Sequence, residues 1–226
     1  MKQYLILALL LLSIPGAAQT TQRIVEVPSG EGPFPVLLVA PAKKYSMKEH
    51  LFQRLADEAL DQGYIVVRFD WNFFTQGKEP SDGLEAEANQ LDEQIEFARS
   101  HPQSSGKVVL AAKSFGSVVA VRRAWRSVEG VLLWTPNSNK DLLFEDVYGP
   151  LLKSSTPTHI VISTTDPYGE LSQLYDYLTN TSAAVTVHTL FGDHNFQTDP
   201  PDDGLNEDAA FAGSVNWLRR YRPEAP

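Results

Sequence analysis

The sequence contains no cysteine, which excludes disulfide bonds, a thiolate nucleophile and thiolate metal ligands. Basic residues are the minority, because 19 Lys and Arg stand against 28 Asp and Glu, for a formal net charge of −9. An acidic protein repels nucleic acid and anionic membrane surfaces, so we expect neither as a partner. The sequence also lacks internal repeats and a glycine-rich phosphate loop, which argues against a solenoid and a nucleotide site of that type.

One apolar run stands out, at the N-terminus. Lys2 precedes the uninterrupted run 5–12, and small residues follow at 16–18. Eight apolar residues are too few to span a bilayer, which takes about 20, and no later run is long enough. The three-part pattern is typical of a secretory signal peptide; the alternative is a buried N-terminal helix or strand. We expect cleavage after Ala18, a mature domain of residues 19–226, and a secreted or periplasmic protein.

The rest of the chain alternates apolar runs with helical patterns. This alternation predicts a single α/β domain in which helices cover both faces of a mostly parallel sheet. The expected strands are 24–27, 36–40, 65–69, 108–111, 131–134, 160–163 and 185–190. The segment 135–158 is the one long insertion between strands, and we expect it to fold over the sheet edge without forming a large lid domain.

The segment 107–120 combines a strand, a sharp turn and a helix. Ser114 lies in the turn, with the small residues Ala112 and Gly116 two positions before and after it. Val118, Val121, Trp125 and Val128 then recur at helical spacing. A serine between a strand and a helix is the arrangement of a nucleophile elbow. The alternative is an ordinary strand-to-helix turn in which Ser114 caps the helix.

A serine nucleophile needs a base, typically a histidine oriented by a carboxylate. Asp166 follows a later expected strand and His194 follows the last one. The other histidines lie at a helix start, in a polar turn or within strands: His50, His101, His159 and His188. Asp193 adjoins His194 in the chain and is better suited to a turn. We therefore predict Ser114 as nucleophile, His194 as base and Asp166 as orienting acid.

An ester carbonyl attacked by serine also needs donors for its developing negative charge. The backbone N–H of Phe115 is the first predicted donor. The second comes from the loop after strand 36–40, where Pro41 has no N–H and the donor is Ala42 or Lys43, with Lys43 favoured.

Aromatic residues near the strand ends are candidate walls of a substrate pocket, although buried aromatics more often belong to the core. They are Trp71, Phe73, Phe74, Trp134 and Tyr168. No metal or cofactor site is expected. Asp199, Asp202 and Asp203 lack the spacing of a calcium loop and are interpreted as a solvated turn.

Three segments carry a family resemblance: A-K-S-F-G-S at 112–117, T-D-P-Y-G at 165–169 and G-D-H-N-F at 192–196. With them the chain resembles the α/β-hydrolase superfamily, and more narrowly the small, nearly cap-less serine hydrolases related to dienelactone hydrolase and to testis-expressed-type hydrolases. The resemblance implies the α/β-hydrolase fold with a minimal lid, and Ser114, Asp166 and His194 as catalytic triad. Pro41-Ala42 departs from it, because many relatives have His-Gly there.

These observations lead to one functional hypothesis and two alternatives. We expect an exported serine hydrolase that cleaves a small-molecule carboxylic ester, with lactones and amides as further substrates of the same chemistry. A catalytically inactive hydrolase-fold protein that binds a ligand or partner is one alternative. Acyl transfer to an alcohol through the same acyl-enzyme is the other.

Overall fold

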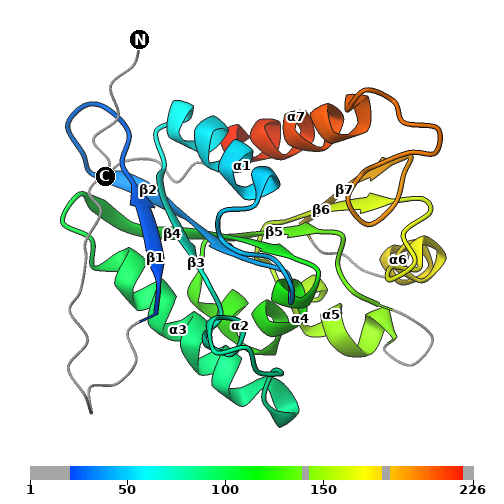
Figure 1. The fold of residues 1–226 in the computed structure, drawn as a ribbon, viewed down its shortest axis with the longest axis horizontal. Helices are drawn as coiled ribbons and strands as arrows, with labels where there is room; N and C mark the ends of the chain where they lie inside the picture. The colour runs from blue at the N-terminus through cyan, green and yellow to red at the C-terminus, as the bar shows by residue number, and fades with distance from the viewer. Residues whose placement is uncertain (1–20, 139–142, 180–183, 221–226) are drawn as a thin grey trace.

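A seven-stranded sheet forms the centre of the protein, with strand order β1-β3-β2-β4-β5-β6-β7 (Figure 1). The structure is a computed structural model and describes residues 21–138, 143–179 and 184–220; the expected signal peptide lies outside these residues. The strands are β1 (Arg23–Glu26), β2 (Phe34–Ala40), β3 (Ile65–Phe69), β4 (Ser104–Lys113), β5 (Gly130–Trp134), β6 (Thr158–Ser163) and β7 (Val185–Leu190).

The central strands are parallel and fully buried. Every residue of β2, β3, β5 and β6 is buried, as expected for parallel strands covered on both faces. Only the edge strand β1 runs antiparallel, pairing Arg23 with Phe69. The order reverses between β2 and β4, so the loops after these two strands diverge at the edge where α/β proteins bind ligands.

Two helical layers cover the sheet. In the view of Figure 1, α1 (His50–Asp61) and α7 (Leu205–Arg220) lie above it, and α3 (Glu85–Arg99), α4 (Phe115–Arg122) and α5 (Phe144–Leu152) lie below. Helix α6 (Leu171–Leu178) shares the core of the lower layer through Leu174 and Tyr177. Each layer encloses its own apolar core against one face of the sheet. The predicted α/β-hydrolase architecture is confirmed.

Two sequence-based expectations about elements were wrong. The helix after Ser114 ends at Arg122, because Arg123 adopts an extended φ of −159°; Trp125 belongs to a separate 3₁₀ turn, η2 (Ala124–Ser127), and Val128 follows it in extended conformation. The insertion 135–158 was expected over the sheet edge. Its described part instead forms α5, which packs between α4 and α6 against the sheet face.

Smaller elements complete the chain. The expected aromatic loop after β3 contains a one-turn helix, α2 (Asn72–Thr75), and the 3₁₀ turn η1 (Asp82–Leu84) precedes α3. No helix within the described ranges combines the length and the apolar character needed to cross a bilayer.

Candidate active site

Ser114 lies at the junction of β4 and α4 in a strained backbone conformation. Its φ is 51° and its ψ is −114°, a region that residues other than glycine rarely adopt and that is concentrated at functional sites. Its N–H donates to the carbonyl of Trp134 at 3.0 Å. The Ser114 side chain makes no capping hydrogen bond to α4, so its hydroxyl does not serve the helix as the alternative interpretation required.

Gly116 allows the sharp turn to form. A Cβ at this position would lie 2.5 Å from the Ala40 carbonyl oxygen and 2.8 Å from that of Pro41. These oxygens belong to the end of β2 and the following loop, so any side chain at position 116 would force two main-chain segments apart. The glycine therefore brings the start of α4 against the loop that carries the second predicted oxyanion donor.

Asp166 and His194 form a direct pair at the ends of β6 and β7. The His194 Nδ1 lies 2.9 Å and 2.8 Å from the two carboxylate oxygens of Asp166. The Asp166 side chain has no exposed surface, and that of His194 is 14% exposed. Because a carboxylate only accepts hydrogen bonds, we assign the ring proton to Nδ1, which leaves the lone pair on Nε2. This is the protonation state that a general base requires.

Neighbouring groups hold this pair in place. The Tyr168 N–H donates to Asp166 Oδ1 at 2.8 Å, and the Tyr168 ring lies edge-on to the imidazole with centroids 5.0 Å apart. Asp193 accepts hydrogen bonds from the backbone N–H groups of Asn195 at 2.8 Å and Gln197 at 3.0 Å. It acts as a turn residue, as the sequence suggested.

The loop after β2 is anchored from the β3 side. Trp71 Nε1 donates to the Pro41 carbonyl at 2.8 Å. Met47 is held at both main-chain groups, by Asp70 Oδ1 at 2.6 Å and Arg68 Nη1 at 2.9 Å. The Lys43 ammonium group is ion-paired with Glu79. The backbone that would carry the Ala42 or Lys43 donor is therefore fixed by several contacts.

Three of the five predicted pocket aromatics lie in the core. Trp71 is 0% exposed and Phe73 7%; they stack with centroids 6.3 Å apart, and both contact Phe115 edge-on. Trp134 is 2% exposed on the other face of the sheet, where Nε1 donates to Ser214 Oγ at 2.8 Å. Closed in by neighbours, these rings do not wall an open pocket. Phe74 is partly buried, and Tyr168 is 53% exposed beside His194.

Lys113 is a residue that the sequence reasoning missed. It is 1% exposed, and its Nζ donates to the His194 carbonyl at 2.7 Å and to Thr135 Oγ1 at 2.9 Å. Burial lowers the pKa of the Lys113 ammonium group to about 7, against the opposing influence of the Asp166 and Asp193 carboxylates. The signal was present in the sequence, because strand alternation places Lys113 on the same buried face as Val109 and Ala111.

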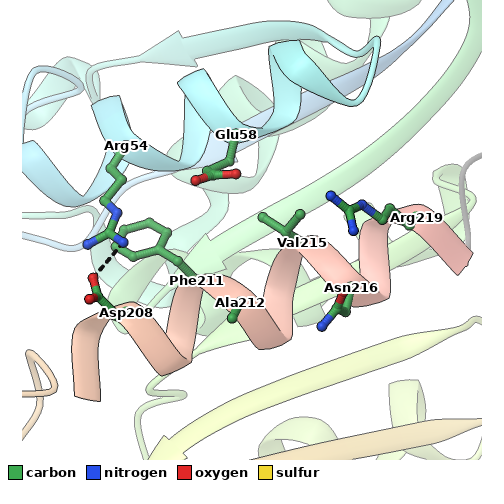
Figure 2. Close-up of a pocket in the computed structure, with 8 residues that line it drawn as sticks. All are labelled: Arg54, Glu58, Asp208, Phe211, Ala212, Val215, Asn216 and Arg219. Carbon is green, nitrogen blue, oxygen red and sulfur yellow. Dashed lines mark ion pairs between the residues drawn. The ribbon is translucent and has the colours of Figure 1, made fainter. Parts of the chain in front are cut away.

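Elsewhere on the molecule, the described residues form a surface groove but no metal site. Across the three described ranges, no group of three or more His, Asp or Glu side chains is arranged to hold a metal ion. A surface groove of about 270 Å³ runs between α1 and α7, where Arg54 pairs with Asp208 at 2.6 Å and lies over the Phe211 ring (Figure 2). It contains none of Ser114, Asp166 and His194, so we do not assign the chemistry to it.

Comparison with known proteins agrees with this architecture. The chain resembles a serine hydrolase without lid from Xanthomonas campestris at 20% identity, covering 95% of this chain and 99% of that one, with a TM-score of 0.69. It resembles a dienelactone hydrolase from Anabaena variabilis at 16% identity, covering 98% and 99%, also with a TM-score of 0.69. A serine hydrolase homologue from Coxiella burnetii matches at 18% identity over 88% and 90%, with a TM-score of 0.65. These identities show the fold alone.

No curated protein matches the chain. A family model does: the one described as alpha/beta hydrolase domain matches residues 36–218, from within β2 to within α7 and across Ser114, Asp166 and His194. The chain therefore belongs to the alpha/beta hydrolase family.

Proposed function

We propose that the protein is a serine hydrolase that cleaves carboxylic esters of small molecules through an acyl-enzyme on Ser114. One observation carries the proposal. Ser114 follows β4 in a strained backbone conformation, and its side chain does not cap α4. It lies at the same carboxyl edge of the sheet as the Asp166–His194 pair, in which both carboxylate oxygens contact Nδ1. A buried carboxylate that holds an imidazole as the Nδ1–H tautomer is suited to proton transfer from a serine. Family membership supports hydrolase chemistry in general.

In the proposed mechanism His194 alternates between base and acid, while Ser114 carries the acyl group. The His194 Nε2 accepts the Ser114 hydroxyl proton as Oγ attacks the ester carbonyl, and the buried Asp166 carboxylate stabilises the imidazolium that forms. The imidazolium then protonates the leaving alcohol, and an ester bond to Ser114 remains. Water, deprotonated by His194, attacks this acyl-enzyme; the bond to Ser114 Oγ breaks, the imidazolium returns the proton to Oγ, and the acid is released.

We propose the Phe115 N–H as the first oxyanion donor and the Ala42 or Lys43 N–H as the second. The Pro41 carbonyl is fixed by Trp71 Nε1 at 2.8 Å and packs against Gly116. In a planar trans peptide the C=O and N–H point in opposite directions, so anchoring the Pro41 carbonyl also fixes the direction of the Ala42 N–H. The Ala42 carbonyl accepts from the Tyr45 N–H at 3.2 Å, which fixes the direction of the Lys43 N–H in the same way, so Ala42 and Lys43 both stay candidates for the second donor. Where many relatives have His-Gly, this chain has Pro41-Ala42. Pro41 has no backbone N–H, but Ala42 keeps its own.

The substrate side of the proposal rests on Tyr168. Its ring is 53% exposed and contacts the His194 imidazole edge-on at 5.0 Å. An exposed aromatic beside the base offers apolar surface to an acyl or alcohol group at the reacting centre. We propose Tyr168 as the main substrate-binding aromatic, with the partly buried Phe74 as a second candidate.

Intact-mass labelling with a fluorophosphonate tests the proposal. Wild type should gain a single adduct, and Ser114→Ala should gain none. The matched control is Ser127→Ala, which removes an exposed hydroxyl in η2 and should label like wild type. Folded wild type that takes no adduct would refute the hydrolase assignment and leave the inactive, ligand-binding alternative.

We also propose that the protein is exported. The proposal rests on the pattern of residues 1–18 in the sequence alone, since these residues lie outside the described structure. N-terminal sequencing of protein recovered from the periplasm or medium of an expressing bacterium should begin at Gln19. Recovery of the chain from the cytoplasm with residue 2 intact would contradict export.

A further inference from the structure

The residue directly before Ser114 is a buried lysine in an apolar layer. Lys113 ends β4 and follows Val109 and Ala111, which belong to the core beneath α1 and α7. Its whole side chain lies on this face of the sheet, with 1% exposure. Burying an ammonium group is unfavourable unless its donors are satisfied. A methionine would fill similar space without the penalty, so the contacts of Lys113 need an explanation beyond packing.

The amine of Lys113 contacts the loop that carries His194. Nζ donates to the His194 carbonyl at 2.7 Å and to Thr135 Oγ1 at 2.9 Å. It also lies 5.4 Å from the ring centroid of Phe196, two residues after His194, and 5.8 Å from that of Tyr45. These distances are within the range of cation–π attraction. All four partners come from loops at the carboxyl edge of the sheet.

These contacts join the two halves of the proposed site. Ser114 is attached covalently to Lys113, while His194 is held by the Lys113 amine through its own main-chain carbonyl. A second bond, from Tyr45 OH to Asn195 Oδ1 at 2.5 Å, ties the same loop to the loop after β2. Lys113 is thus a direct link between Ser114 and the His194 loop, although β7 lies at the edge of the sheet, three strands from β4.

We propose that Lys113 is a positioning residue that sets the placement of His194 relative to Ser114. The inference rests on the proposed function, since it concerns the same reaction. Lys113 touches neither substrate nor reacting atoms; it acts through the His194 main chain. The groups that face its amine are the Asp166 and Asp193 carboxylates, the His194 main chain, the Thr135 hydroxyl and the Tyr45 ring.

Lys113→Met tests this role, because methionine keeps the length and the apolar packing and removes the donors. We expect a folded protein whose kcat for p-nitrophenyl acetate falls about ten-fold or more while KM stays within about two-fold, since small misplacements of catalytic groups can cost 10²-fold. The rate of fluorophosphonate labelling should fall by a similar factor. A merely structural role would lower the melting temperature and leave the rate per folded molecule unchanged.

Ser127→Ala is the control. It removes an exposed hydroxyl in η2, away from these contacts, so labelling should stay near the wild-type rate. If folded Lys113→Met labels as fast as wild type, the positioning role is wrong. If Lys113→Met does not fold, Lys113→Leu is judged by the same thresholds. Wild type that takes no label refutes the proposed function itself, whereas labelled wild type with an equally fast Lys113 variant refutes this inference alone.

Discussion

At the scale of single residues, Asp166 and Asp193 offer a natural comparison. Both are acids near His194, yet Asp166 contacts Nδ1 with both oxygens, while Asp193 accepts backbone N–H groups of its own turn. The distinction arises from geometry, because residue 193 adjoins the histidine in the chain whereas residue 166 approaches it from the neighbouring strand end. A pair of equal substitutions can separate the two roles.

Asp166→Asn should lower kcat for ester hydrolysis by on the order of 10³–10⁴, because an amide can donate to Nδ1 and thereby stabilise the wrong tautomer of His194. Asp193→Asn keeps an oxygen acceptor for the turn and should remain within a few-fold of wild type. Steady-state kinetics of both variants on p-nitrophenyl acetate makes the comparison. Equal losses of kcat in the two variants would show that negative charge near the histidine, rather than the direct Asp166–His194 contact, supports the activity.

The sequence predicted some of these residues better than others. Ser114, Asp166 and His194 could be singled out because each directly follows an expected strand. The pairing of Asp166 with His194 is observed, and their catalytic roles stay predictions. Trp71 and Trp134 were predicted as pocket walls but are buried in the core. The sequence does not tell which way a large ring turns at a strand end, and large aromatic side chains are usually mostly buried. Lys113 was overlooked because a charged residue is expected to be solvated.

At the scale of elements, the packing of α4 against the loop after β2 depends on Gly116, which has no side chain. Gly116→Ala would place a methyl group 2.5 Å from the Ala40 carbonyl oxygen. To relieve this contact, the main chain of α4 or that of the β2 end would have to move. We expect a fall in stability of about 1–3 kcal/mol, as for overpacking in a core, and a loss of labelling at Ser114. Urea unfolding and fluorophosphonate labelling measure the two effects.

Gly149→Ala supplies the control for that variant. Gly149 lies in α5, where an added Cβ would have its nearest neighbour, the Tyr177 hydroxyl, at 3.4 Å. This variant should label normally and keep its stability, because alanine is the better helix former. A similar loss of labelling in both variants would mean that the turn at Ser114 does not depend on close approach at position 116.

The elements themselves were largely predictable. Most strands contain a short apolar run, β7 alternates apolar and polar residues, and β3 and β7 match the expected bounds. The end of α4 was not predictable from periodicity, since Trp125 and Val128 continue the helical spacing but pack from a 3₁₀ turn and an extended segment. Apolar spacing reports which side chains are buried and not whether one helix carries them all.

At the scale of the whole molecule, a buried histidine links stability to pH. His159 belongs to β6; its Nδ1 lies 2.7 Å from Thr186 Oγ1, and its ring stacks on Trp217 of α7. Burial, with a smaller contribution from His188, lowers the pKa of His159 to about 4. The unfolded chain binds this proton below about pH 6.5, so stability should fall as pH drops from about 6.5 to 4, by on the order of 3 kcal/mol.

His159→Phe, which keeps a ring against Trp217, should remove much of this acid sensitivity. The measurement is urea unfolding at pH 7.5 and pH 4.5. His50→Gln, at an exposed position, should keep the wild-type difference between the two pH values. An unchanged difference in His159→Phe would assign the acid sensitivity to other groups.

The order of the strands in the sheet also determines at what stage of folding the proposed site is assembled. The proposed residues are separated by 80 positions of chain, from Ser114 to His194, and four strands from β4 to β7 must register before they meet. Such non-local pairing folds slowly compared with local contacts. A nascent chain would therefore have no activity until the C-terminal third has docked. Recovery of labelling after dilution from denaturant would then serve as a clock for completion of the fold.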